Sequence, residues 1–500
     1  MFPERESTWP RQRVVRKEAH LFLANRQTIL LNAVLAGLVF GALPLSDTFT
    51  VWVCSLSVLV QAWILRGQIK RGNFLCAAAG FCLTAMLLMG LLIPAMWQPS
   101  DLNGYFDPGL LTSSLTDLAN RVLLLTSSLH YVIAIALAPT RAWTWKAPDM
   151  AERKAARILA LPLLVSGVFL CFLTRPGTLI TSVSYPSNLN VNRGVLSSIS
   201  GLPLIAFFLL SLSMVAACRA YGVSSWRYRW TVVAALAAVI YFNFLRGNRA
   251  GILFVVSPAL FLFYLCSKMP RLKRFLVLVV TVTATFLLLQ VWASARANAA
   301  DIGLGSAMVE GWKENVEPMT ERFDPIQVQM LPQSYWQLLN VEYLVRNGLS
   351  ARGATVNALL VQSIPESIAR LLHVERPLNS AWLIGQYGAQ SSGGMYIVAE
   401  GYWNFGMLGA LGVAAALALI TVGFERWSQR QEPLLAFVYF AFLGSLGFGI
   451  FYGLEPFARA VEVTAALAVF ARLAINAFRK SLKHRSFASR LWQSRVRGIW

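Results

Sequence analysis

The sequence predicts an all-α polytopic membrane protein, and three observations predict this class. The 500 residues are 56% hydrophobic and only 13% charged. Apolar runs recur from one end of the chain to the other, and each has the length of about 17 or more residues that a helix needs to cross a bilayer. The charged residues lie mainly in the links between these runs, as they do in proteins with many membrane spans.

We expect about 12 transmembrane helices, nine within residues 1–293 and three within residues 405–477. Residues 294–404 separate the two sets and residues 478–500 form a basic tail. The expected spans are residues 28–45, 48–65, 74–97, 122–138, 157–174, 199–218, 230–245, 250–267, 275–293, 405–423, 434–452 and 460–477.

The segment of residues 294–404, which precedes the tenth span, is far longer than an ordinary connection, and loops of this length are usually functional. Apolar and charged residues alternate at helical spacing in residues 335–349 and 356–372. These stretches predict short amphipathic helices, which either lie on the membrane surface or pack on one another.

The distribution of Lys and Arg predicts the orientation of the chain. With the N-terminus in the cytoplasm, 30 of the 44 Lys and Arg residues fall in segments on the inner side and 13 fall outside, although the longest loop is outside. The excess of Lys and Arg is present at every inner link. Both termini are therefore expected to be cytoplasmic, and the large loop is expected to be periplasmic.

The net charge of +21 does not predict a nucleic-acid partner, because the cations follow the pattern of membrane topology. The six cysteines all lie inside apolar runs without the spacing of metal ligands, so we expect no disulfide and no metal. Motifs for cytoplasmic ATP, nucleotide sugars or metal-dependent hydrolysis are missing from the sequence, and no cofactor is expected.

The stretch FLRGNRAG, residues 244–251, places Arg246 and Arg249 in an outer link, where positive charge is unusual. Arginine stays charged and binds phosphate through a planar pair of donors, and the following span offers the free N–H groups of a helix N-terminus. Together these features predict an anion site at the outer membrane surface. The alternative is that the arginines only anchor the link among lipid headgroups.

A second cluster, GGMYIVAEGYWNFGMLGALG at residues 393–412, ends the large loop and enters the tenth span. Glu400 and Asn404 are four residues apart and share a helical face, whereas Tyr402 lies on another face. A carboxylate at the end of a membrane span raises the free energy of the folded protein unless it is paired or exposed to water. Glu400 is therefore a candidate functional residue. The alternative is an acid that stabilises a helix N-terminus.

A third cluster, YGLEPFARAVE at residues 452–462, forms the last outer link, in which Glu455 and Arg459 are spaced as a helical ion pair. A purely structural salt bridge is the simpler interpretation of this pair. The outer segments contain further cations, among them Arg296 and Arg376, which would make an outer cavity attractive to an anionic lipid-linked substrate.

With these clusters the chain resembles the O-antigen and exopolysaccharide repeat-unit polymerases of bacterial envelopes (the Wzy type). The resemblance rests on many spans, a large outer loop late in the chain and an Arg-containing motif that begins a mid-chain span. It rests above all on glycines that precede an acid, an aromatic residue and Asn-Phe-Gly at the start of a helix. Those residues are Gly393, Gly394, Glu400, Tyr402, Asn404, Phe405 and Gly406.

The resemblance implies a GT-C-like membrane glycosyltransferase in the bacterial inner membrane. Its substrates would be oligosaccharides on undecaprenyl diphosphate at the periplasmic face, and a chain-length regulator and a flippase would be its partners besides membrane lipid. Arg246 and Arg249 would stabilise the leaving diphosphate, helped by Arg296, Arg376 or Arg459. Glu400, or secondarily Glu455, would accept the proton of the acceptor hydroxyl, and Tyr402 and Asn404 would orient sugar hydroxyls or Glu400.

Two other functions remain open at this point. An O-antigen ligase uses the same donor but delivers the polymer to the lipid A core. Such ligases show an outer-loop His often followed by Asn, whereas His373 is followed by Val374 here. A lipid-linked oligosaccharide flippase or transporter would need charges along a cavity that reaches both faces, whereas the predicted spans are nearly free of charge.

Overall fold

A computed structural model describes the middle and the late part of the chain, and the described residues are mainly helical, with no strand among them. These are residues 113–137, 150–174, 202–246, 250–266, 302–315, 332–362, 371–374 and 395–430, with further single residues between positions 59 and 473. The expected spans at residues 28–45, 48–65, 74–97 and 434–452 lie outside the described part, apart from Leu59.

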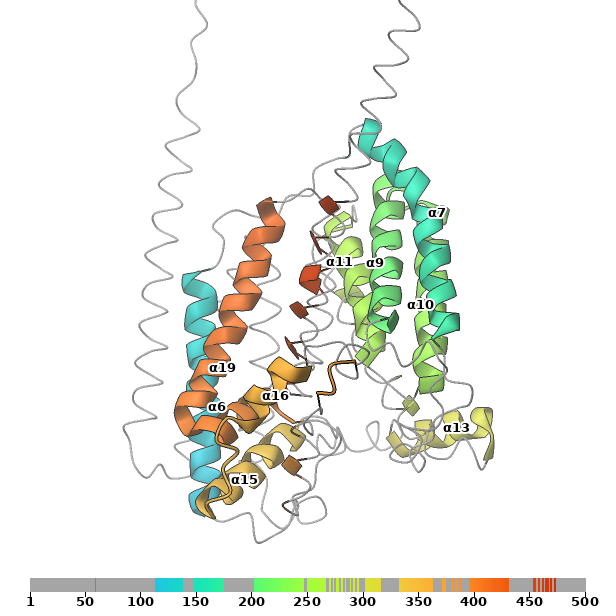
Figure 1. Ribbon diagram of the computed structural model, residues 1–500. Helices are drawn as coiled ribbons and strands as arrows, with labels where there is room; N and C mark the ends of the chain where they lie inside the picture. Colours follow the sequence, from blue (N-terminus) through green and yellow to red (C-terminus); the bar gives the residue numbers. More distant parts are fainter. Residues whose placement is uncertain are drawn as a thin grey trace, which may run out of the picture.

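Nine helices are described from end to end. They are α6 Ser113–Ala136, α7 Met150–Leu173, α9 Leu202–Tyr221, α10 Trp226–Arg246, α11 Ala250–Cys266, α13 Leu304–Asn315, α15 Pro332–Arg346, α16 Ala354–Gln362 and α19 Ile397–Arg430. Figure 1 shows the longer ones upright, with the shorter α13, α15 and α16 toward their lower end.

Six of the expected spans coincide with helices, namely those that α6, α7, α9, α10, α11 and α19 cover. Residues 153–173 of α7 and 397–427 of α19 are long and apolar enough to cross a membrane, and residues 205–221 of α9 form a shorter apolar helix. The helical class is therefore confirmed, and the two long apolar helices are compatible with an all-α membrane protein.

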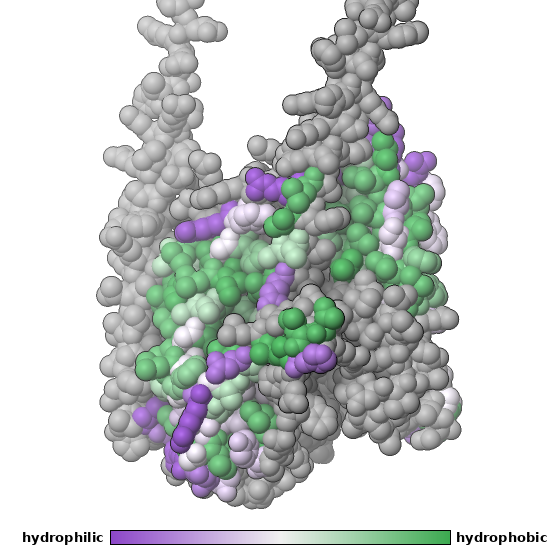
Figure 2. Space-filling view, viewed as in Figure 1, coloured by the Kyte–Doolittle hydropathy of each residue, from purple (hydrophilic) through white to green (hydrophobic). Residues whose placement is uncertain are grey.

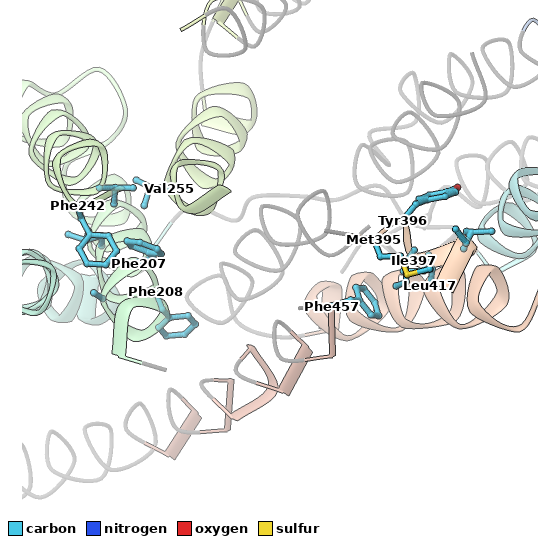
Figure 3. Packing of buried hydrophobic residues seen from close by; sticks show 14 of the residues in the cluster. Phe207, Phe208, Phe242, Val255, Met395, Tyr396, Ile397, Leu417 and Phe457 are labelled. Carbon is cyan, nitrogen blue, oxygen red and sulfur yellow. The ribbon is translucent and has the colours of Figure 1, made fainter. Parts of the chain in front are cut away.

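Two groups of helices form the core (Figure 3). In one group, α9 packs against α7, α10 and α11, and the rings of Phe207 and Phe242 meet edge to face at 5.5 Å. In the other group, α6 packs against α19 and α15, and Leu417 and Phe457 are buried beside the start of α19. Edge-to-face ring contacts of this kind add to the energy of apolar burial.

Buried hydroxyl groups in these helices bond to their own backbone. Thr126 Oγ1 donates to the Val122 carbonyl at 2.6 Å, Ser211 Oγ to Phe207 at 2.9 Å and Thr421 Oγ1 to Leu417 at 2.7 Å. A hydroxyl group placed in an apolar environment needs such a partner, and the carbonyl one turn earlier supplies it without help from another helix. These residues are therefore compatible with a span.

Residues 294–404 contain α13, α15 and α16. α15 covers most of the stretch predicted at residues 335–349, and α16 covers the first part of the stretch predicted at residues 356–372, up to Gln362. α15 packs against α6 and α19, and α16 packs against α19. For these two helices the structure shows packing on the neighbouring long helices. Figure 1 shows them at the lower end of those helices.

α19 bends sharply at Phe405 and Gly406, where the predicted loop meets the predicted span. Gly406 has φ 60° and ψ −148°, a conformation that residues with a side chain rarely adopt. On either side of the bend the backbones of Gly401 and Gly409 touch, since a Cβ on Gly401 would lie 2.7 Å from the Gly409 carbonyl oxygen. The helix therefore begins eight residues before the expected span, as a separate short segment.

Gly409→Ala should destabilise the protein by about 2 kcal/mol or more, because the new methyl group would overlap the Gly401 carbonyl oxygen and force the two segments apart. Thermal unfolding in detergent, followed by loss of helical circular dichroism, measures the effect. Gly412→Ala is the matched control on the same helix, since a Cβ there meets no atom within 4 Å. Equal melting temperatures for the two variants would contradict the prediction.

Candidate functional site

Glu400 lies in the first turn of α19 and its side chain is almost completely buried, with 1% of the residue exposed. Its backbone N–H donates to the Tyr396 carbonyl at 2.9 Å, which anchors the helix start. A carboxylate in an apolar interior needs hydrogen bonds from its surroundings to be tolerated. The groups that provide them come from three different segments of the chain.

The Leu454 backbone N–H donates to Glu400 Oε2 at 2.7 Å. The hydroxyl groups of Thr355, at the start of α16, and of Ser380 are also hydrogen-bonded to the Glu400 carboxyl group. Both hydroxyl residues are themselves buried. A single side chain therefore joins α19, α16, the segment at Ser380 and the segment at Leu454.

Gly453 makes room for this arrangement. It has φ +108°, which favours glycine, and a Cβ at this position would lie 2.6 Å from Glu400 Oε2 and 3.3 Å from Ser380 Oγ. The backbone can therefore approach the carboxyl group closely enough for the next residue, Leu454, to donate its N–H.

Asn404 shares the face of Glu400, as the spacing of four residues predicts. Its Nδ2 group donates to Thr355 Oγ1 at 2.7 Å and to the Glu400 backbone carbonyl at 2.7 Å. Among the described residues its buried Oδ1 has no hydrogen-bond partner. Asn404 thus orients Thr355 toward Glu400, and its own carbonyl oxygen remains available to a donor.

Tyr402 points to a different face, toward α15, where its phenol is hydrogen-bonded to Glu342. Glu342 is buried and accepts a hydrogen bond at 2.6 Å from Arg346 Nε, one turn later on the same helix. Gln337 of α15 accepts a hydrogen bond from the Tyr396 backbone N–H. The start of α19 is therefore held against α15 by polar contacts on one side and by the Glu400 contacts on the other.

Tyr396 immediately precedes α19, and its phenol is buried. Burial raises the pKa of Tyr396 above the usual range, so this side chain stays a neutral hydroxyl group. Among the described residues the phenol oxygen has no hydrogen-bond partner.

Glu455 follows Leu454 directly, and its negative charge acts on the Glu400 carboxyl group, so these two predicted acids lie near each other. Arg246 is the last residue of α10, and α11 begins at Ala250, but the structure does not describe the Arg246 side chain. The other predicted cations lie outside the described residues: Arg249, Arg296, Arg376 and Arg459.

Sequence reasoning missed the hydroxyl partners of Glu400 and the Glu342–Arg346 pair. Nothing in the sequence separates Thr355 and Ser380 from other hydroxyl residues of the loop, because only the fold brings them to Glu400. The Glu342–Arg346 spacing of four residues on a predicted helix was a usable signal. Within the described residues no three His, Cys, Asp or Glu side chains gather as a metal site would require.

The site therefore consists of a buried carboxyl group held by two hydroxyl groups and one backbone N–H. The interactions are those that a carboxylate base makes with an alcohol before it takes the proton. The Asn404 amide and the Tyr402 phenol extend from the same first segment of α19, the amide toward Thr355 and the phenol toward Glu342. The arrangement suits proton transfer from a hydroxyl group and recognition of a polyhydroxylated ligand.

Gly453→Ala should disrupt this site, because the methyl group would enter the space of the Glu400 carboxyl group and the residue would keep an unfavourable positive φ. We expect a loss of about 2–4 kcal/mol in unfolding free energy, measured by thermal unfolding in detergent. Gly348→Ala is the matched control, since Gly348 has φ +77° with no atom within 4 Å of a Cβ. If both variants lose the same stability, close approach to Glu400 is not the reason for the glycine.

Arg346→Gln should destabilise the protein by about 1–2 kcal/mol, because the buried Glu342 carboxylate loses its cation while the arginine is itself partly exposed. The double variant with Glu342→Gln should recover most of that loss, since it removes the uncompensated charge. Thermal unfolding of the two single variants and the double variant tests the coupling. Strictly additive losses would show that the pair does not interact.

No protein-family model, curated protein or solved structure matches the chain. The family of the protein is therefore not shown by comparison. Its function is inferred from its own residues and their arrangement.

Proposed function

We propose that this protein is a membrane glycosyltransferase that polymerises oligosaccharide repeat units carried on undecaprenyl diphosphate. The observation that carries the proposal is the buried Glu400 carboxyl group bound by hydroxyl groups at the start of an apolar helix. The sequence pattern from Gly393 to Gly406 places the same acid in the motif that resembles repeat-unit polymerases.

In the proposed reaction, a hydroxyl oxygen at the non-reducing end of the acceptor unit attacks the anomeric carbon of the donor polymer. The bond between that carbon and the diphosphate oxygen breaks, and undecaprenyl diphosphate leaves with the bonding electrons. The proton of the attacking hydroxyl passes to the Glu400 carboxylate. In the structure the hydroxyl groups of Thr355 and Ser380 are hydrogen-bonded to the Glu400 carboxyl group. The attacking sugar hydroxyl would replace one of them.

The neighbouring side chains suit a sugar substrate. Asn404 Oδ1 is a buried acceptor without a partner among the described residues, and a sugar hydroxyl is a hydrogen-bond donor. Tyr402 lies at the same helix start and is held by a hydrogen bond to Glu342. Asn404 is therefore assigned the positioning of the acceptor, and Glu455 adds a second acid near Glu400. Tyr402 turns to Glu342 on another face, so its part is to hold the start of α19 in place.

The leaving diphosphate gains negative charge in the transition state, and cations aimed at it lower the barrier. Arg246 and Arg249 are assigned this role, since they lie where α10 ends and α11 begins. The N-terminal N–H groups of α11 favour an anion at the same place. Arg296, Arg376 and Arg459 are the further candidates for binding the diphosphate.

The proposal includes the membrane arrangement that the sequence predicts. Twelve spans, a periplasmic loop of residues 294–404 and two cytoplasmic termini would place Glu400 at the periplasmic face of the bacterial inner membrane. A flippase would deliver the lipid-linked units to this face, and a chain-length regulator would limit the polymer. The reaction needs neither a nucleotide sugar nor a metal.

Glu400→Gln and Arg249→Ala should each lower polymer formation by about a hundredfold or more, because one removes the proton acceptor and the other a charge at the leaving group. The assay incubates purified protein in detergent with lipid-linked repeat units and resolves the polymer ladder on a gel. Arg426→Gln, an exposed cation near the other end of α19, is the control and should keep full activity.

The outcomes separate the three functions. Chain growth in detergent identifies a polymerase, because a flippase has no product without a sealed membrane. Transfer to added lipid A core, without chain growth on the repeat units, would identify a ligase. A normal ladder from Glu400→Gln would overturn the role of Glu400, provided that the variant unfolds at the temperature of the wild type.

A further inference from the structure

A cluster of exposed cations lies at one end of the group formed by α7, α9 and α10. The first two turns of α7 and the first turn of α10 contribute them, and α9, which packs against both helices, ends at Tyr221 beside them. We call these residues the basic end: Arg153, Lys154, Arg157, Arg227 and Arg229. None of them takes part in the proposed reaction.

Two guanidinium groups of the basic end converge on a single aromatic ring. Arg157 Cζ lies 5.8 Å and Arg227 Cζ 5.2 Å from the centre of the Tyr221 ring. The ring attracts each cation, and two like charges gathered at one ring repel each other. An anion bound by both guanidinium groups would offset that repulsion. A phosphate group suits this position, because it accepts several charge-assisted hydrogen bonds at once.

An apolar stripe on α7 begins directly after the cations. Large side chains recur every three or four residues along one face and are exposed. Lys154 and Arg157 lie one turn before the first two of them and therefore on the same face. The stripe consists of Ile158, Leu161, Val165, Phe169 and Phe172.

α10 carries a second exposed apolar stripe beside the first, and α10 and α7 pack together. Phe172 and Tyr241 join the two stripes at the far end, with ring centres 5.6 Å apart. At the basic end, Trp226 and Trp230 are 66% and 63% exposed. Tryptophan at such a position is typical of the boundary between hydrocarbon and headgroups. Figure 2 shows hydrophilic residues above a hydrophobic flank in this part of the molecule.

We propose that the basic end and the two stripes form a binding site for an anionic phospholipid. Arg157 and Arg227 bind the headgroup phosphate, and the acyl chains follow the apolar stripes of α7 and α10. The occupant is a membrane lipid rather than a free anion, because the apolar surface continues directly from the cations. The site is separate from Glu400, and it does not depend on the proposed reaction.

The test measures lipid binding to purified, delipidated full-length protein by native mass spectrometry, with phosphatidylglycerol and phosphatidylcholine added in equal amounts. The wild type should retain phosphatidylglycerol preferentially. The double variant Arg157→Gln/Arg227→Gln should bind it on the order of tenfold or more weakly, since each cation near an anionic headgroup strengthens binding several-fold. Lys313→Gln removes an exposed charge on α13, near the opposite end in Figure 1, and should keep the preference.

A second variant, Arg157→Lys/Arg227→Lys, keeps the charges and should retain most of the preference, and it controls for misfolding of the glutamine variant. Inorganic phosphate at millimolar concentration should not displace the lipid, whereas displacement would show a site for free phosphate. Equal retention of the two lipids by the wild type would overturn the proposal. An unchanged preference in the glutamine variant would overturn it as well.

Discussion

A carboxyl group that is removed from water has to be held by hydrogen bonds, and much of the described architecture around Glu400 satisfies this one requirement. Its partners are the Leu454 N–H and two hydroxyl groups, on Thr355 and Ser380. They come from the segment that precedes α19, at Thr355 and Ser380, and from the segment at Leu454 that follows it. A group that is costly to bury thus becomes the point at which these segments are brought together.

The bend in α19 makes this arrangement possible. The short segment before Phe405 carries Glu400 and Asn404 toward α16, while the long segment after Gly406 continues as an apolar helix against α6. Gly401 and Gly409 let the two segments touch, which no larger residue at position 409 would allow. The polar site and the apolar helix are therefore consecutive in sequence yet face different surroundings.

The two ends of the upright helices differ in their chemistry. Glu400, Glu455 and Glu342 lie at the end that α15 and α16 cover, whereas the exposed cations of the basic end gather where α7 and α10 begin. In the proposed topology this separation matches the retention of positive charge on the cytoplasmic side of membrane proteins. The acidic end is then the proposed site of the reaction, and the basic end is the proposed site of contact with anionic lipid.

The helical class, the approximate position of six long helices and the shared face of Glu400 and Asn404 were all predictable from the sequence alone. Apolar length and the 3.6-residue period are local properties, so they are readable without a fold. Only the tertiary structure decided that Thr355, Ser380 and Leu454 bind Glu400, that Tyr402 turns to Glu342, and that Arg157 and Arg227 meet at Tyr221. These contacts join residues distant in the chain, and their geometry depends on how helices pack and where glycine lets backbones approach.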